Sequence, residues 1–232
     1  MNAQAAAGVA ERVAAVRQRI ASACARAGRD PAEVRLIAVS KTFGAEAVAE
    51  AVAAGITEFG ENRVQEALAK QPAVEALVRE RGLPSPAWHL VGHLQSNKAK
   101  AAAGAFAILH GIDSIGLLNV LNRAAGDRRL AVLLEVNVAG EATKFGFAPG
   151  AVAEAVDAAR GLPGVEVIGL MTVAPRVANP ELARPVFREL ARLAREHGLR
   201  ELSMGMTEDF EVAIEEGATM VRIGRAIFGE RS

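Results

Sequence analysis

The chain has 232 residues, and its 27 basic and 27 acidic side chains cancel. Balanced charge gives no strong field for nucleic acid or an anionic membrane, so we expect neither as a partner. No apolar run approaches the roughly 20 residues that span a bilayer. Nor does the alanine-rich N-terminus have the basic start and compact apolar stretch of a signal peptide. Cys24, the single cysteine, excludes an intrachain disulfide and suits a reducing compartment, so we expect a soluble, cytoplasmic protein.

The apolar pattern predicts alternating helices and strands from the N-terminus onward. Apolar residues at helical spacing, from Val9 to Ile20, predict an amphipathic helix over 5–27. The apolar, β-branched segment 34–41 predicts a strand, and 46–54 predicts the next helix. A short strand at 58–61 precedes a helix over 62–81, in which Pro72 should start a new helix or introduce a kink.

The same alternation continues to the C-terminus. Strands are predicted at 88–94, 107–113, 131–138, 165–173, 201–206 and 220–223. The helices between and after them are predicted at 96–103, 114–125, from Pro149 onward, and at 180–197, 209–216 and 225–228. Eight strand–helix units in succession, with nearly continuous apolar strands, predict a parallel sheet covered on both faces.

A single α/β domain over residues 1–232 accommodates these units. A closed (β/α)8 barrel, the TIM barrel, with one extra N-terminal helix fits their number and the chain length. An open doubly wound sheet is the structural alternative. No linker, low-complexity tract or second domain is apparent.

The candidate site follows from this architecture, because barrel active sites lie at the C-terminal ends of the strands. The polar and flexible residues predicted there are Ser40, Lys41, Glu61, Asn62, His93, Gln95, Asp113, Asn137, Lys144, Met171, Thr172, 203–207 and 222–225. The chain has only five lysines and no tyrosine, which restricts its chemistry.

Lys41 is the first candidate, because it ends an apolar strand where burial of its charge is costly. Two interpretations stay open from its position alone. The side chain either reaches solvent or pairs with Glu61, or it has a lowered pKa and forms a Schiff base with an aldehyde. Lys144, in a loop, is the other candidate amine. The remaining lysines lie in helical segments and are expected to be solvated: Lys70, Lys98 and Lys100.

The last two units are typical of a phosphate site, which strands seven and eight of such barrels often supply. Glycine in segments 203–207 and 222–225 lets the backbone approach an anion, and serine or threonine adds a hydroxyl donor. Thr207 is also expected to cap the following helix. His89 and His93 have no companions at metal-ligand spacing, so we expect no metal site.

Six ordered blocks then resemble the pyridoxal-phosphate homeostasis protein family, the YggS-like proteins related to the N-terminal domain of alanine racemase. The similarity runs from about residue 10 to 230. The blocks are V-S-K-T at 39–42, G-E-N-R-V-Q-E at 60–66, W-H-L-V-G-H-L-Q-S-N-K at 88–98, G-L-M-T-V at 169–173, L-S-M-G-M-T at 202–207 and V-R-I-G-R-A-I-F-G at 221–229.

The resemblance implies a barrel that holds pyridoxal 5′-phosphate (PLP) as a Schiff base on Lys41. It implies that phosphate is held by Ser203, Gly224 and the Arg225 backbone, that Arg222 faces the pyridine nitrogen, and that Asn62 and Met171 line the pocket. The family has no known robust catalytic turnover and is linked to vitamin B6 supply and to amino-acid and keto-acid balance. The implied function is therefore PLP homeostasis, with PLP-dependent client enzymes and small amino acids as further partners.

The chain departs from the family at two positions. Many members have K-T-K-P where this chain has Lys41-Thr42-Phe43-Gly44, so a second lysine near the site is missing. This departure puts in doubt a role for that lysine in moving PLP between sites. Thr207 stands where serine is usual.

Two features separate a PLP carrier from a PLP enzyme. An arginine against the pyridine nitrogen stays charged and disfavours protonation of that nitrogen, which weakens the ring as an electron sink. Related racemases use a tyrosine from a second domain as one base, and this chain has no tyrosine. Three hypotheses stay open: a non-enzymatic PLP homeostasis protein, a PLP enzyme with weak racemase or transaminase activity, and a Schiff-base aldolase.

Overall fold

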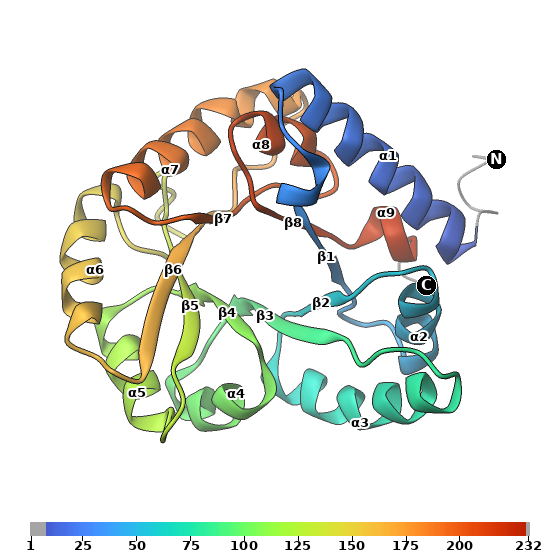
Figure 1. Ribbon diagram of the computed structural model, residues 1–232. Coiled ribbons are helices and arrows are strands. Elements are labelled where there is room, and N and C mark those ends of the chain that lie inside the picture. The colour runs from blue at the N-terminus through green and yellow to red at the C-terminus, as the bar shows by residue number, and fades with distance from the viewer. Residues whose placement is uncertain (1–7, 231–232) are drawn as a thin grey trace.

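The computed structural model describes residues 8–230 and shows a closed barrel of eight parallel strands (Figure 1). Consecutive strands pair, and β8 returns to pair with β1. The (β/α)8 prediction is confirmed, and the open doubly wound sheet was wrong. The strands are β1 (Arg35–Val39), β2 (Glu58–Glu61), β3 (Ala87–His93), β4 (Ile108–Ile112), β5 (Leu130–Glu135), β6 (Val165–Met171), β7 (Glu201–Ser203) and β8 (Met220–Ile223).

Helices surround the barrel, and α1 is the extra N-terminal helix, which packs against α8 and α9 (Figure 1). Residues 5–7 of the predicted first helix lie outside the described residues. The helices are α1 (Val9–Ala27), α2 (Ala45–Ala53), α3 (Val64–Glu80), α4 (Ala99–Ala105), α5 (Ile115–Ala124), α6 (Val152–Arg160), α7 (Arg184–Glu196), α8 (Phe210–Glu215) and α9 (Arg225–Phe228). Among the helices within residues 8–230, none is long and apolar enough to cross a membrane.

Helix α3 runs through Pro72, so the predicted start of a new helix there was wrong. Proline removes one hydrogen bond from a helix interior at a cost of roughly 3 kcal/mol. The buried side chains of Ala67, Val74 and Val78 lie on both sides of Pro72 and hold the helix on the barrel. Their burial offsets the lost hydrogen bond, because each buried aliphatic side chain contributes roughly 1.5–3 kcal/mol.

The apolar core has two parts. The larger part lies between the strands and the surrounding helices. The smaller part contains residues from strands alone and fills the barrel interior: Ile37, Ile108, Leu133, Met171 and Met220. The interior is therefore packed, and a ligand has to bind at its mouth.

Six strands end earlier than the apolar pattern predicts: β3 and β4 by one residue, β1 at Val39 and β6 at Met171 by two, and β5 at Glu135 and β7 at Ser203 by three. After β1, the amide of Phe43 donates to the Ser40 carbonyl and closes a turn. Thr42 in this turn has φ 70°, a left-handed conformation that threonine rarely adopts. The earlier ends move the site residues into loops and make Glu135 a strand-end residue.

Candidate functional site

Lys41 lies half-buried in the turn that follows β1, at the C-terminal mouth of the barrel. Helix α3 fixes this turn, because Glu66 Oε1 accepts a hydrogen bond from the Thr42 amide at 2.5 Å. The turn therefore presents Lys41 from a backbone that is hydrogen-bonded on both sides, by Phe43 to Ser40 and by Thr42 to Glu66.

Lys70 also reaches this turn, and the expectation that it is solvated was wrong. Its Nζ donates to the Ser40 carbonyl at 2.8 Å and to Glu61 Oε1 at 2.6 Å, and only 9% of its side chain is exposed. The Ser40 hydroxyl donates to the same carboxylate oxygen at 2.7 Å. Burial raises the pKa of Glu61, although the hydrogen bonds from Lys70 and Ser40 oppose the shift. Glu61 thus has Lys70 as its ion-pair partner.

Arg222 on β8 is almost fully buried beneath the mouth. Its guanidinium donates to Ser203 Oγ at 2.5 Å and to the Thr172 carbonyl at 2.8 Å. Burial lowers the pKa of Arg222 to about 10, against the charges of Glu135 and Asp209, so the group stays charged at neutral pH. The Ser203 hydroxyl, which the resemblance assigns to phosphate, also lies 2.9 Å from His110 Nδ1 inside the barrel.

The segment after β8 lies against the end of β1, next to the turn that carries Lys41. A Cβ on Gly224 would lie 3.2 Å from the Val39 carbonyl, so only glycine lets these backbones approach without displacement. The Arg225 side chain is exposed and pairs with Glu208 at 2.7 Å, which links the two loops. The Phe43 ring stacks on Phe228 of α9 with centroids 5.0 Å apart. The residue that replaces the family's second lysine thus joins the Lys41 turn to α9.

The predicted cap at Thr207 was wrong. The N-cap of α8 is Asp209, whose Oδ1 accepts the Met206 amide at 2.6 Å. Burial raises the pKa of Asp209, against the hydrogen bond from Met206 and the charge of Arg222. Thr207 is therefore two residues before the N-cap, half-buried in the loop after β7.

The predicted pocket residues Asn62 and Met171 lie at the same end of the barrel. Met171 is buried at the end of β6 and belongs to the interior apolar cluster, so it forms part of the floor. A Cβ on Gly92 would lie 2.5 Å from the Asn62 carbonyl, so the backbones after β2 and within β3 are in close contact. A hollow of about 310 Å³ opens here, lined by Asn62, Arg63, Val64, Gln65, Gly92, His93, Gln95 and Lys98.

A second group of charged side chains occupies the β3–β5 side of the mouth. His93 Nδ1 lies 3.0 Å from Asp113 Oδ2, and its ring stacks on Phe145 with centroids 4.0 Å apart. Lys144 pairs with Glu141 at 3.2 Å. Burial raises the pKa of Glu135, although the charge of Arg222 opposes the shift.

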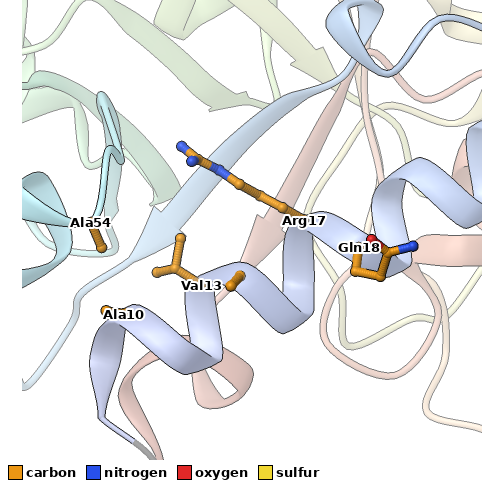
Figure 2. Close-up of a pocket in the computed structure, with 6 residues that line it drawn as sticks. Ala10, Val13, Arg17, Gln18 and Ala54 are labelled. Atoms are coloured by element: carbon orange, nitrogen blue, oxygen red, sulfur yellow. The ribbon is translucent and has the colours of Figure 1, made fainter.

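A further hollow, of about 390 Å³, lies between α1 and α2 and away from the mouth (Figure 2). Its lining consists of Ala10, Val13, Ala14, Arg17, Gln18 and Ala54. The Arg17 guanidinium donates to the Gly55 carbonyl at 2.6 Å, which ties the two helices together. None of the predicted site residues lines it, so the barrel mouth is the candidate site.

Sequence reasoning missed three residues near the site: Lys70, His110 and Glu135. Glu135 was hidden because the strand was predicted to extend to 138, which placed Asn137 at its end. His110 alternates with apolar neighbours on β4, and that alternation is a signal for an inward-facing side chain. Lys70 had no local signal, because charged helical positions are usually solvated. Among residues 8–230, no group of His, Cys, Asp and Glu is arranged to hold a metal ion.

Comparisons with known proteins show the family of the chain. The alanine racemase N-terminal domain family matches residues 12–232. The pyridoxal phosphate homeostasis protein of Aquifex aeolicus is 44% identical, over 95% of this chain and 97% of its own. That of Escherichia coli K12 is 41% identical, over 96% and 97%. The chain belongs to the pyridoxal phosphate homeostasis protein family.

Solved structures of relatives share the barrel. PipY of Synechococcus elongatus, in a structure with PLP bound, is 37% identical with a TM-score of 0.80 and covers 95% of this chain and 100% of its own. Without PLP its TM-score is 0.82. An alanine racemase of Clostridium difficile is only 14% identical with a TM-score of 0.66, and the match covers 92% of this chain but 55% of the racemase. That likeness shows the fold alone.

Proposed function

We propose that the protein binds PLP at the barrel mouth as a Schiff base on Lys41 and serves PLP homeostasis without robust catalytic turnover. The observation that carries this proposal is the buried Arg222 on β8, the strand that pairs with β1 ahead of Lys41, in a family whose relative PipY is seen with PLP bound. The single cysteine suits the cytoplasm as its compartment. Partners in the proposal are PLP, client enzymes that receive it, and small amino acids.

The residues present fit the cofactor. Lys41 is half-buried and supplies the amine, and Asn62 and Met171 form the wall and the floor. Arg222, which stays charged, would face the ring nitrogen as a donor. Gly224 lets the backbone approach a phosphate closely, next to the amide of Arg225. When bound, PLP supplies an aldehyde for the Schiff base and a ring that can delocalise electrons.

The assignment of phosphate to Ser203 needs a refinement. Its hydroxyl already has His110 and Arg222 as partners inside the barrel. In our proposal the phosphate is held by backbone amides of the loops after β7 and β8, at Gly205, Thr207, Gly224 and Arg225, because the Met206 amide already donates to Asp209. Ser203 stays in the proposed site as the residue that supports Arg222.

The test is chemical trapping of the amine. We expect borohydride treatment of the PLP-loaded protein to fix a pyridoxyl group on Lys41, located by peptide mass spectrometry. The Lys41→Ala variant should carry no adduct, and the exposed Lys100→Ala variant should be labelled like the wild type. An adduct on Lys144 in the wild type would refute the assignment. Failure of PLP to bind at all would refute the function.

A further inference from the structure

A column of polar side chains runs through the barrel interior from the N-terminal ends of the strands to Arg222. His89 Nε2 lies 3.1 Å from Glu58 Oε2 at the start of β2. His89 Nδ1 lies 3.0 Å from His110 Nε2, and His110 Nδ1 lies 2.9 Å from Ser203 Oγ. His89, His110 and Ser203 are all at most 1% exposed. Barrel interiors are normally filled by branched apolar residues, so this column has a cost that a function has to justify.

The chemistry of the donors fixes the direction of the column, that is, which side chain donates and which accepts in each hydrogen bond. Arginine can only donate, so Ser203 Oγ accepts from Arg222. The single hydrogen of the hydroxyl then goes to His110 Nδ1. A neutral His110 consequently carries its proton on Nε2 and donates to His89 Nδ1. His89 in turn carries its proton on Nε2, which faces Glu58.

The reverse direction leaves a buried group unsatisfied. If His110 donated to Ser203, the hydroxyl would accept twice and its own hydrogen would have no acceptor among the partners that the described residues give it. Such a buried unsatisfied group costs about 1–3 kcal/mol. Burial lowers the pKa of His110 well below its ordinary value, which keeps the ring neutral. Burial opposes ionisation of Glu58, but the contacts with His89 and Arg35 outweigh it and lower the pKa of that carboxyl.

We propose that His110 is a positioning residue for the cofactor ring. By accepting the hydrogen of Ser203, it turns a lone pair of that hydroxyl toward Arg222 and fixes the guanidinium between Ser203 and the Thr172 carbonyl. The oriented guanidinium is then held as a donor to the ring nitrogen of PLP. This last step rests on the proposed function, whereas the direction of the column does not.

The direction of the column is tested in the ligand-free protein. The chain has four histidines, so ¹⁵N-histidine labelling and long-range proton–nitrogen spectra can resolve each ring. The His110→Gln variant assigns the His110 signals. We expect both His89 and His110 as neutral rings protonated on Nε2. A His110 ring protonated on Nδ1 would overturn the proposal, whether or not PLP binds.

The effect on the cofactor is tested with PLP labelled with ¹⁵N in its ring. In His110→Phe, the ring-nitrogen resonance should shift and the Kd for PLP should rise at least about tenfold, the lower limit for loss of one hydrogen bond to a charged group. In His110→Gln, whose amide oxygen can accept from Ser203, the wild-type resonance should largely return. His197→Gln, at the C-cap of α7, is the matched control and should leave both quantities unchanged.

The outcomes separate the two proposals. An unchanged ring-nitrogen resonance and Kd in His110→Phe would overturn the role of His110, with PLP binding intact. If His110→Phe does not fold, Ser203→Ala should produce the same shift, and an unchanged resonance in that variant would overturn the role equally. If the wild-type protein does not bind PLP, the proposed function is rejected, and with it the role of His110 toward the cofactor. The histidine tautomers would still decide the direction of the column.

Discussion

The two sides of the barrel mouth differ in how firmly their side chains are held. On the side of Lys41, Lys70 and Arg222 are buried and hydrogen-bonded to backbone carbonyls as well as to side chains. On the β3–β5 side, His93 stacks on Phe145, a ring that is 56% exposed. The first side is prepared to hold a ligand in one orientation, whereas the second is open to solvent.

A carrier and a two-base enzyme make different demands on these two sides. Preorganised donors bind without first being ordered, so they contribute affinity. Proton transfer to and from both faces of a substrate requires a positioned base on each face. Three predictions follow this contrast, and each asks whether one side of the mouth behaves as its contacts indicate.

The largest effect is expected from removal of the phosphate. Pyridoxal should bind at least a hundredfold more weakly than PLP, because two or three charge-assisted hydrogen bonds, worth roughly 1.5–3 kcal/mol each, are lost at the loops after β7 and β8. The measurement is titration by absorbance or calorimetry with both ligands. Equal affinity for the two would show that these loops do not hold the phosphate. Pyridoxal should still be trapped on Lys41 by borohydride at high concentration, which controls for the integrity of the site.

The next effect concerns stability on the same side. Lys70→Met should destabilise the protein by about 3–5 kcal/mol at neutral pH, because it leaves the buried Glu61 carboxylate without its ion-pair partner. Urea unfolding measures this loss. The exposed Lys100→Met is the control and should change the free energy of unfolding by less than about 0.5 kcal/mol.

The pH dependence of this loss has a definite sign. Burial raises the pKa of Glu61, so the folded protein binds the proton more tightly than the unfolded chain. The contribution of Glu61 to the free energy of unfolding is fully present below the pKa that this carboxyl has in the unfolded chain. It is lost as the pH rises through the pKa that the carboxyl has in the folded protein. Removal of Lys70 raises that pKa further, so Lys70→Met should lose less stability at pH 5 than at pH 8. The same loss at both values would show that Glu61 is not the group responsible.

The sequence predicted the barrel, because strand–helix alternation is a local signal. Lys41 and Arg222 were proposed as site residues from their positions at strand ends, which the sequence also shows. The partners of these residues could not be found, because they depend on barrel closure. Lys70 contacts Ser40, which lies thirty residues away in the sequence. His110 contacts Ser203, which lies ninety-three residues away. Glu135 was missed for a smaller reason, since an apolar run does not mark where its strand stops pairing.

The smallest effect is expected at the open side of the mouth and concerns racemisation of amino acids. Racemisation needs a carbanion stabilised by the ring and a base on each face. In the proposed site Arg222 would weaken the ring as an electron sink, since it stays charged and only donates. Lys41, once freed by a bound amino acid, can act as one base. The chain has no tyrosine for the other face. His93, paired with Asp113, is the imidazole among the titratable side chains on that side of the mouth, which also include Glu135 and Lys144.

We therefore expect racemisation of L-alanine and of a panel of other L-amino acids below about 1 s⁻¹, the low end of ordinary enzymes. The measurement is chiral analysis together with deuterium uptake at Cα from heavy water. Slow uptake without racemisation would indicate a single base and agree with a carrier. In that case His93→Gln should leave the uptake unchanged, because Lys41 alone exchanges the proton. Turnover above that rate that disappears in His93→Gln would show that the open side supplies a second base and that the protein is an enzyme.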